Sequence, residues 1–182
     1  MRGPGERAGL TRSAVLGAAR EVLAEAGLRG LTMRALARRL EVAPNALYSH
    51  VPDKDGLVDA LLDEHLAPVT DPPTDSADPL AAVGAMMRST YDRLLEAPDL
   101  VPLYFARRGA RGEHARRLGA TMDALFARAG VPAESIPGAR GTLIVHALGS
   151  AAFATAGGDP AASRAAFTAG LGWLLTGIAA QR

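Results

Sequence analysis

The chain has 182 residues, of which 48% are hydrophobic and 21% are charged, and its formal net charge is +1. This composition supports a globular fold with a sizeable core and argues against global disorder. There is no cysteine, which excludes disulfides, thiolate zinc sites and a cysteine nucleophile. No apolar run is long enough to span a bilayer, and the first residues lack the apolar segment of a secretory signal. We therefore expect a cytoplasmic protein without a membrane partner.

Positive charge is concentrated at the start of the chain. Up to Lys54 there are nine basic and five acidic residues, whereas residues 55–66 contain four acidic residues and no basic one. This asymmetry is expected if the first quarter of the chain contacts nucleic-acid phosphates, although a solvated helical surface would have the same composition.

Few β-branched residues, no alternation of apolar and polar residues, and abundant alanine, leucine and arginine predict an all-α protein. Apolar spacing and capping residues predict helices at 11–26, after Thr32, at 44–50 and after Asp53. A proline-rich loop at 67–76 follows, and further helices are predicted at 79–96, 100–106, 113–129, 137–156 and 160–180. We therefore predict three parts: a flexible N-terminal arm (1–10), a three-helix DNA-binding domain with a helix-turn-helix (11–66), and a C-terminal helical domain for ligand binding and dimerisation (77–182).

Residues 31–54 have the layout of a helix-turn-helix, in which two short amphipathic helices are joined by a turn at residues 41–43. In this motif the second helix enters the major groove of DNA. Ala43, Pro44 and Asn45 are small enough for close approach to base edges, and the asparagine amide suits adenine.

Other side chains in this segment suit the DNA backbone. The Thr32 hydroxyl, the Tyr48 ring and hydroxyl, and the Lys54 ammonium are expected to contact phosphate. Arg34 is expected to reach a guanine edge or a phosphate, and His50 can add a hydrogen bond. The alternative is that Tyr48 and His50 pack between helices while Arg34 is merely solvated.

The segments 30–37 (GLTMRALA) and 47–51 (LYSHV), followed by Asp53, Lys54 and Leu57, resemble the DNA-binding signature of the TetR family of repressors. The resemblance covers residues 11–66. It implies a homodimer that binds a palindromic double-stranded DNA operator, and a C-terminal domain that binds a small effector and forms the dimer interface. An activator of the same fold, and an interaction protein that no longer reads DNA, are the alternatives to a repressor.

Methionine and aromatic side chains in the C-terminal helices suit a pocket for a largely apolar effector. The candidates are Met86, Met87, Tyr91, Tyr104, Phe105, Met122, Phe126, Ile144, His146 and Phe153. Each of these residues is also a common core residue. The basic turn with Arg107, Arg108 and Arg111 either attracts an anionic ligand or is simply solvated.

The last two predicted helices are rich in small residues, which permit close helix packing, and they carry an apolar stripe. They suit a four-helix contact between two subunits, or alternatively an intramolecular core. The candidates for the dimer interface are Leu148, Ala152, Leu171, Leu174, Leu175 and Ile178.

Residues 145–149 (VHALG) are similar to the tetracycline-repressor branch in particular, whose members hold a magnesium–drug chelate through pocket histidines. No clear counterpart of the metal-ligating histidine is present, so we expect no metal site and no cofactor. The sequence also lacks a histidine pair at metal spacing, a nucleophile motif and a phosphate-binding glycine loop, so we expect no enzyme activity.

Overall fold

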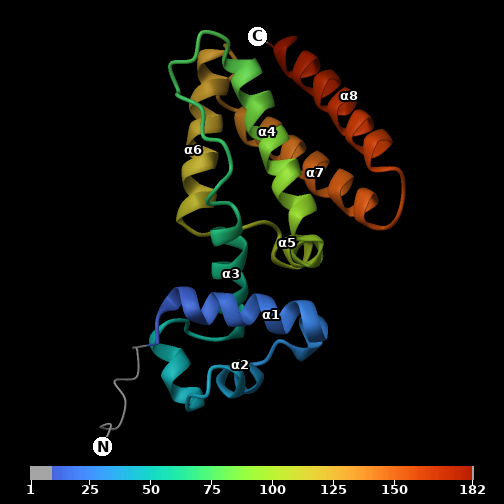
Figure 1. Ribbon diagram of the computed structural model, residues 1–182. Helices are drawn as coiled ribbons and strands as arrows, with labels where there is room; N and C mark the ends of the chain where they lie inside the picture. Colours follow the sequence, from blue (N-terminus) through green and yellow to red (C-terminus); the bar gives the residue numbers. More distant parts are fainter. Residues whose placement is uncertain (1–9, 182) are drawn as a thin grey trace, which may run out of the picture. The chain divides into compact units, whose positions relative to one another are not determined.

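The computed structural model describes residues 10–181, so the predicted flexible arm lies, except for its last residue, outside the described part. All regular structure in the described part is helical (Figure 1), which confirms the predicted all-α class. The chain forms two compact units, which divide between Leu61 and Leu62. This division falls inside a helix, upstream of the predicted boundary loop at 67–76. Within residues 10–181, no helix combines the length and the hydrophobicity that a membrane span requires.

The first unit contains α1 (Arg12–Gly30), α2 (Met33–Arg39), the 3-10 helix η1 (Pro44–Ser49) and the first two turns of α3 (Lys54–His65). The N-cap of α1 is Thr11, whose Oγ1 accepts a hydrogen bond of 3.1 Å from the amide of Ala14. The helix is broken at Gly27, where φ is 63°, a conformation that favours glycine. The predicted start and the predicted stop of this helix are therefore both confirmed.

The apolar faces of these helices form the small core of the first unit. α1 packs against α2, and α2 packs against η1. The fully buried side chains of this core are Val15, Ala19, Leu31, Leu36, Leu47, Leu57 and Leu61. Ala26, an apolar residue in the last turn of α1 before the break at Gly27, is exposed.

The second unit contains the end of α3 and six further elements. These are α4 (Pro79–Glu96), η2 (Pro98–Leu100), α5 (Val101–Arg107), α6 (Glu113–Arg128), α7 (Ile136–Thr155) and α8 (Pro160–Ala179). The four long helices begin and end within one residue of the predicted bounds. The short helix predicted at 100–106 also agrees within one residue with α5, and the 3-10 turn η2, which Pro98 starts, precedes it.

α4 and α7 form the centre of the second unit. α4 packs against α6, α7 and α8, and α7 also packs against α5, α6 and α8. Figure 1 shows α6 and α8 on opposite sides of the crossing pair α4 and α7. The starts of α4 and α8 are fixed by aspartate caps, since Asp78 Oδ1 and Asp159 Oδ1 each accept an amide hydrogen bond of 3.0 Å.

Candidate functional site

α2 and η1 form the helix-turn-helix pair of the first unit. Thr32 is the N-cap of α2, and its Oγ1 accepts a hydrogen bond of 3.1 Å from the amide of Ala35. The hydroxyl proton of Thr32 is left to donate, which suits a phosphate oxygen. In the turn between the helices Glu41 adopts φ 54°, and the amide of Val42 donates to Ala37 O at 3.0 Å.

The first residues of η1 are exposed to solvent, and the leucine that follows them is buried in the core of the first unit. Leu47 is completely buried, whereas residues 43–46 are exposed, and 50% of the Tyr48 surface is accessible. Ser49 Oγ donates to Ala46 O at 2.8 Å and closes the last turn of η1. Pro44, Asn45 and Tyr48 are therefore free to meet another molecule, and Tyr48 is not enclosed between helices.

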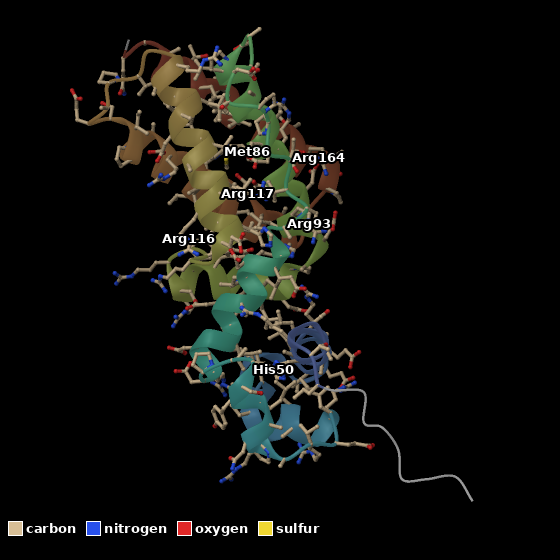
Figure 2. The ribbon with its side chains drawn as sticks, turned by 90° about the vertical axis from the view of Figure 1, so that its left-hand side faces the viewer. His50, Met86, Arg93, Arg116, Arg117 and Arg164 are labelled. Carbon is tan, nitrogen blue, oxygen red and sulfur yellow. The ribbon has the colours of Figure 1, made fainter. Side chains whose placement is uncertain are left out.

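The remaining predicted DNA-contacting residues have different surroundings. Arg34 on α2 is exposed, and His50, labelled in Figure 2, is half-buried directly after η1. Lys54 Nζ donates to Leu28 O at 3.1 Å, at the end of α1. Because an ammonium has three N–H donors, Lys54 can hold this carbonyl and still contact a phosphate.

Arg39 connects the first two helices of the unit. Its Nε donates to Glu21 Oε2 at 2.8 Å and its Nη2 donates to Glu25 Oε1 at 2.7 Å, both on α1. These hydrogen bonds hold the pKa of the Glu25 carboxyl below its ordinary value and raise the pKa of the guanidinium. No pattern in the sequence indicates that Arg39, unlike Arg34, forms ion pairs within the chain.

The second unit contains a cavity of about 500 Å³ between α4, α6 and α7. Five of the ten predicted pocket residues line it: Met86, which Figure 2 labels, Met87, Tyr104, Met122 and Ile144. Small residues create much of the remaining space, namely Ala115, Gly119 and Ala147. The choice of methionine and aromatic residues as candidates misses such positions, although Ala115 and Gly119 are four residues apart and so share one face of α6.

The other five predicted pocket residues do not line this cavity: Tyr91, Phe105, Phe126, His146 and Phe153. Tyr91 and Phe126 are completely buried in the helix core, and the Tyr91 ring stacks on Phe167 at 4.0 Å. His146 Nε2 lies 3.0 Å from Phe167 O, between α7 and α8. Phe105 and Phe153 are exposed, because they lie on helix faces that no neighbour covers.

Polar groups are few in the cavity wall. The Tyr104 hydroxyl donates to Leu62 O at 2.9 Å, and burial raises the pKa of Tyr104. Asp123 of α6 pairs with Arg140 of α7. Arg108 and Arg116 also line the cavity, and of these two only Arg108 belongs to the predicted basic turn. Within residues 10–181 no cluster of three possible metal ligands occurs.

The first turn of α6, next to the cavity, is capped by a residue of α3. Asp63 Oδ1 accepts a hydrogen bond of 2.9 Å from the amide of Ala115, and Oδ2 accepts one of 3.3 Å from the amide of His114. The approach is close, since a Cβ at Gly112 would lie 2.1 Å from Asp63 Cγ. A carboxylate at this position satisfies free amides and complements the helix dipole.

The predicted dimer-interface residues of α7 and α8 fall into two groups. Leu148, Leu171 and Ile178 are buried in the core of the chain itself, so their side chains are not available to a partner. Ala152, Leu174 and Leu175 are partly exposed. The same two helices expose Val145, Phe153 and Trp173, to 64%, 84% and 77%.

Comparison with known proteins gives sequence matches in part of the chain and structural matches over almost all of it. The family described as "Bacterial regulatory proteins, tetR family" matches residues 15–61. The tetracycline repressor protein class D of Escherichia coli is 48% identical over 58 residues, which is 32% of this chain and 27% of the repressor. The match thus spans about a quarter of that repressor's length.

Solved structures match almost the whole chain. The transcriptional regulator SCO7222, a TetR from Streptomyces coelicolor, is 32% identical with a TM-score of 0.76, and the match covers 95% of this chain and 99% of that one. BioQ, solved with its natural double-stranded DNA operator, is 30% identical with a TM-score of 0.75, and the match covers 94% and 99% of the two chains. These relatives are regulators, which agrees with the expectation that the chain is not an enzyme.

Proposed function

The chain belongs to the TetR family of bacterial regulatory proteins, and on this premise we propose that it is a cytoplasmic repressor that binds a palindromic operator as a homodimer. A small, largely apolar effector bound in the second unit releases it from DNA. The observation that carries the proposal is the exposed start of η1, residues 43–46, held on the buried Leu47 next to the capped helix α2. The operator complex of BioQ supports the DNA-binding part.

The start of η1 supplies the base contacts in this proposal. Ala43 and Pro44 permit close approach to the floor of the major groove, and Asn45 donates and accepts at an adenine edge. His50 adds a hydrogen bond at the other end of η1.

Backbone contacts come from both sides of the turn. The Thr32 hydroxyl and the Tyr48 hydroxyl donate to phosphate oxygens, and Arg34 pairs with a phosphate or a guanine. Lys54 contributes the donors that its bond to Leu28 O leaves free. Such contacts orient the protein, and they make its affinity fall as the salt concentration rises.

Homodimerisation uses the outer faces of α7 and α8. These two adjacent helices expose Val145, Phe153 and Trp173. An exposed apolar patch of this kind is typical of a protein–protein interaction site. A two-fold contact between these faces makes a four-helix interface, to which the partly exposed Ala152, Leu174 and Leu175 add area. Two-fold symmetry of the protein then requires two-fold symmetry of the operator.

Release by the effector uses α3. This helix runs without a break from Lys54 to His65, and its Asp63 caps α6, whose residues line the cavity. A ligand that displaces the start of α6 therefore pulls on α3, which carries Lys54 and follows directly after η1. The displacement changes the spacing of the two DNA-reading helices in the dimer.

Selection of bound duplexes from a random pool tests the DNA-binding proposal. We expect the purified protein to enrich an inverted repeat whose half-site centres lie about 10 base pairs, or a multiple of this, apart. Arg34→Ala should reduce the enrichment, whereas Arg88→Ala, at an exposed position of the second unit, should leave it unchanged. Failure to enrich any sequence, or enrichment of a single half-site without a repeat, would contradict the proposal.

A further inference from the structure

The cavity of the second unit is apolar over most of its wall but carries four charged side chains. Methionine, leucine, isoleucine and alanine side chains from α4, α6 and α7 form the apolar part. The charged residues are Arg108, Arg116, Asp123 and Arg140. A volume of about 500 Å³ suits a drug-sized molecule, and in such pockets a few polar groups select the ligand.

Asp123 and Arg140 neutralise each other. Arg140 Nη1 donates to Asp123 Oδ2, and this pair joins α6 to α7. The other carboxylate oxygen, Asp123 Oδ1, is buried and has no hydrogen-bond partner in the described part of the chain. Because Arg140 already supplies the positive charge, an uncharged donor on a ligand, such as a hydroxyl or an amide, is sufficient to satisfy this oxygen.

Arg108 and Arg116 differ from this pair, since neither has a carboxylate partner within residues 10–181. Arg108 is the C-cap of α5, with φ 56°, and its amide donates to Phe105 O at 3.1 Å, which fixes its backbone in the cavity wall. Arg116 lies near the start of α6. Figure 2 labels Arg116 and the adjacent Arg117, and only Arg117 pairs with a carboxylate, that of Asp71.

The uncompensated charge of the wall is therefore positive and comes from two arginines. Two acidic residues lie at the start of α6: Asp63, which accepts hydrogen bonds from the amides of His114 and Ala115, and the exposed Glu113, for which no ion pair with either arginine is found in residues 10–181. Guanidinium groups bind carboxylate, sulfonate and phosphate oxygens through parallel charge-assisted hydrogen bonds. The two arginines would repel a cationic ligand. A neutral ligand would leave both guanidinium groups solvated, without an anionic partner.

We propose that the cavity binds an amphipathic anion. Its apolar body lies against Met86, Met87 and Ile144, and its carboxylate or sulfonate pairs with Arg108 and Arg116. The inference rests on the proposed function, because it takes this cavity as the effector site and adds the chemical class of the effector.

Two fluorescent probes with the same ring system test the role of charge. Anilinonaphthalene sulfonate is an anion, and phenylnaphthylamine is its neutral counterpart. We expect the double variant Arg108→Gln/Arg116→Gln to bind the sulfonate about tenfold more weakly than the wild type, the effect of two partly exposed ion pairs. The neutral probe should bind both proteins equally. If the double variant does not fold, Arg116→Gln alone, at an exposed helical position, should weaken the sulfonate about threefold.

The control variant, Arg88→Gln/Arg128→Gln, removes the same charge from exposed positions of the second unit that do not line the cavity. It should bind both probes like the wild type. Equal weakening of both probes by the cavity variant, or equal weakening of the sulfonate by the control, overturns the inference and leaves the proposed effector site intact. If neither probe binds the wild type, the proposed effector site fails as well.

Discussion

Arg34 and Arg39 lie on the same short helix, α2, but have different surroundings. Arg39 is held by the carboxylates of Glu21 and Glu25 on α1, whereas Arg34 is exposed and forms no ion pair in residues 10–181. A guanidinium between two carboxylates contributes little field to an approaching phosphate, because its charge is compensated. Of these two arginines, only Arg34 belongs to the proposed DNA interface.

The Arg39 pair makes stability depend on pH. Its hydrogen bond lowers the pKa of Glu25 from 4.5 in the folded protein, so the pair stabilises the fold above that value and loses its effect as the pH falls through the lowered pKa. We predict that Arg39→Ala lowers the Tm at about pH 7 and that the difference from wild type is smaller in acid, well below pH 4.5. Thermal melts followed by circular dichroism measure both differences.

The control for this prediction is Arg38→Ala, at an exposed position on the same helix. Its Tm difference from wild type should not depend on pH in this range. A difference for Arg39→Ala that is the same at both pH values would contradict the role assigned to the pair.

At the scale of elements, the turn between α2 and η1 contains a strained residue. Glu41 adopts φ 54°, where a side chain other than glycine or asparagine is unfavourable. We predict that Glu41→Asn stabilises the protein by about 0.5–1 kcal/mol, measured by urea unfolding. Arg38→Asn, in ordinary helical backbone nearby, should instead destabilise it. A loss of stability in both variants would show that the Glu41 side chain forms a contact that stabilises the fold by more than its positive φ destabilises it.

The cap of α6 by Asp63 is the second element-scale feature with a measurable effect. We predict that Asp63→Ala lowers the free energy of unfolding by about 1 kcal/mol, because two amides at the start of α6 lose their acceptor. Asp63→Asn, which retains one acceptor oxygen, should lose less. If α3 transmits the effector signal, Asp63→Ala should also reduce the change in operator affinity that a ligand causes. Unchanged stability and unchanged coupling together would remove Asp63 from the proposed mechanism.

Most of the elements could be predicted because their ends carry local signals. Thr32, Asp78 and Asp159 cap helices whose starts were predicted, and Gly27 breaks α1 where its end was predicted, since capping and positive φ depend on a few neighbouring residues. The 3-10 geometry of η1 was not predicted. Over so short a segment, the spacing of apolar residues does not distinguish an α-helix, with 3.6 residues per turn, from a 3-10 helix, with three.

The cavity could be predicted only in part. Met86 lines it, Phe126 is buried elsewhere in the core and Phe153 is 84% exposed, although all three are large apolar residues on helices. Helical periodicity shows which residues share a face, but which neighbour covers that face is set by tertiary packing. For the same reason Leu171 was assigned to a dimer interface and lies in the core of the chain.

At the scale of the whole molecule, the proposed homodimer depends on the outer face of α7 and α8. Trp173 and Phe153 are the most exposed large apolar side chains of the described residues. We predict that Trp173→Glu halves the molecular mass in solution, because a charge in the centre of a two-fold interface faces its own copy. Light scattering coupled to size exclusion measures this mass. Ala127→Glu, at an exposed position of α6, is the control that should leave the mass unchanged.

The result also bears on DNA binding, since a monomer reaches only one half-site. A Trp173→Glu protein with the mass of the wild type would contradict the proposed interface. A Trp173→Glu monomer that binds the palindrome as tightly as the wild type would instead contradict the link between dimer and operator.

The central claim is that the first unit reads DNA through η1 with backbone contacts from Tyr48 and Lys54. Fluorescence anisotropy of the selected palindrome, titrated with wild type, Tyr48→Ala and Lys54→Ala at several salt concentrations, tests it most directly. We predict that each variant binds about tenfold more weakly. The slope of log affinity against log salt should decrease by about one unit for Lys54→Ala but not for Tyr48→Ala. Wild-type affinity and slope in both variants would contradict the claim.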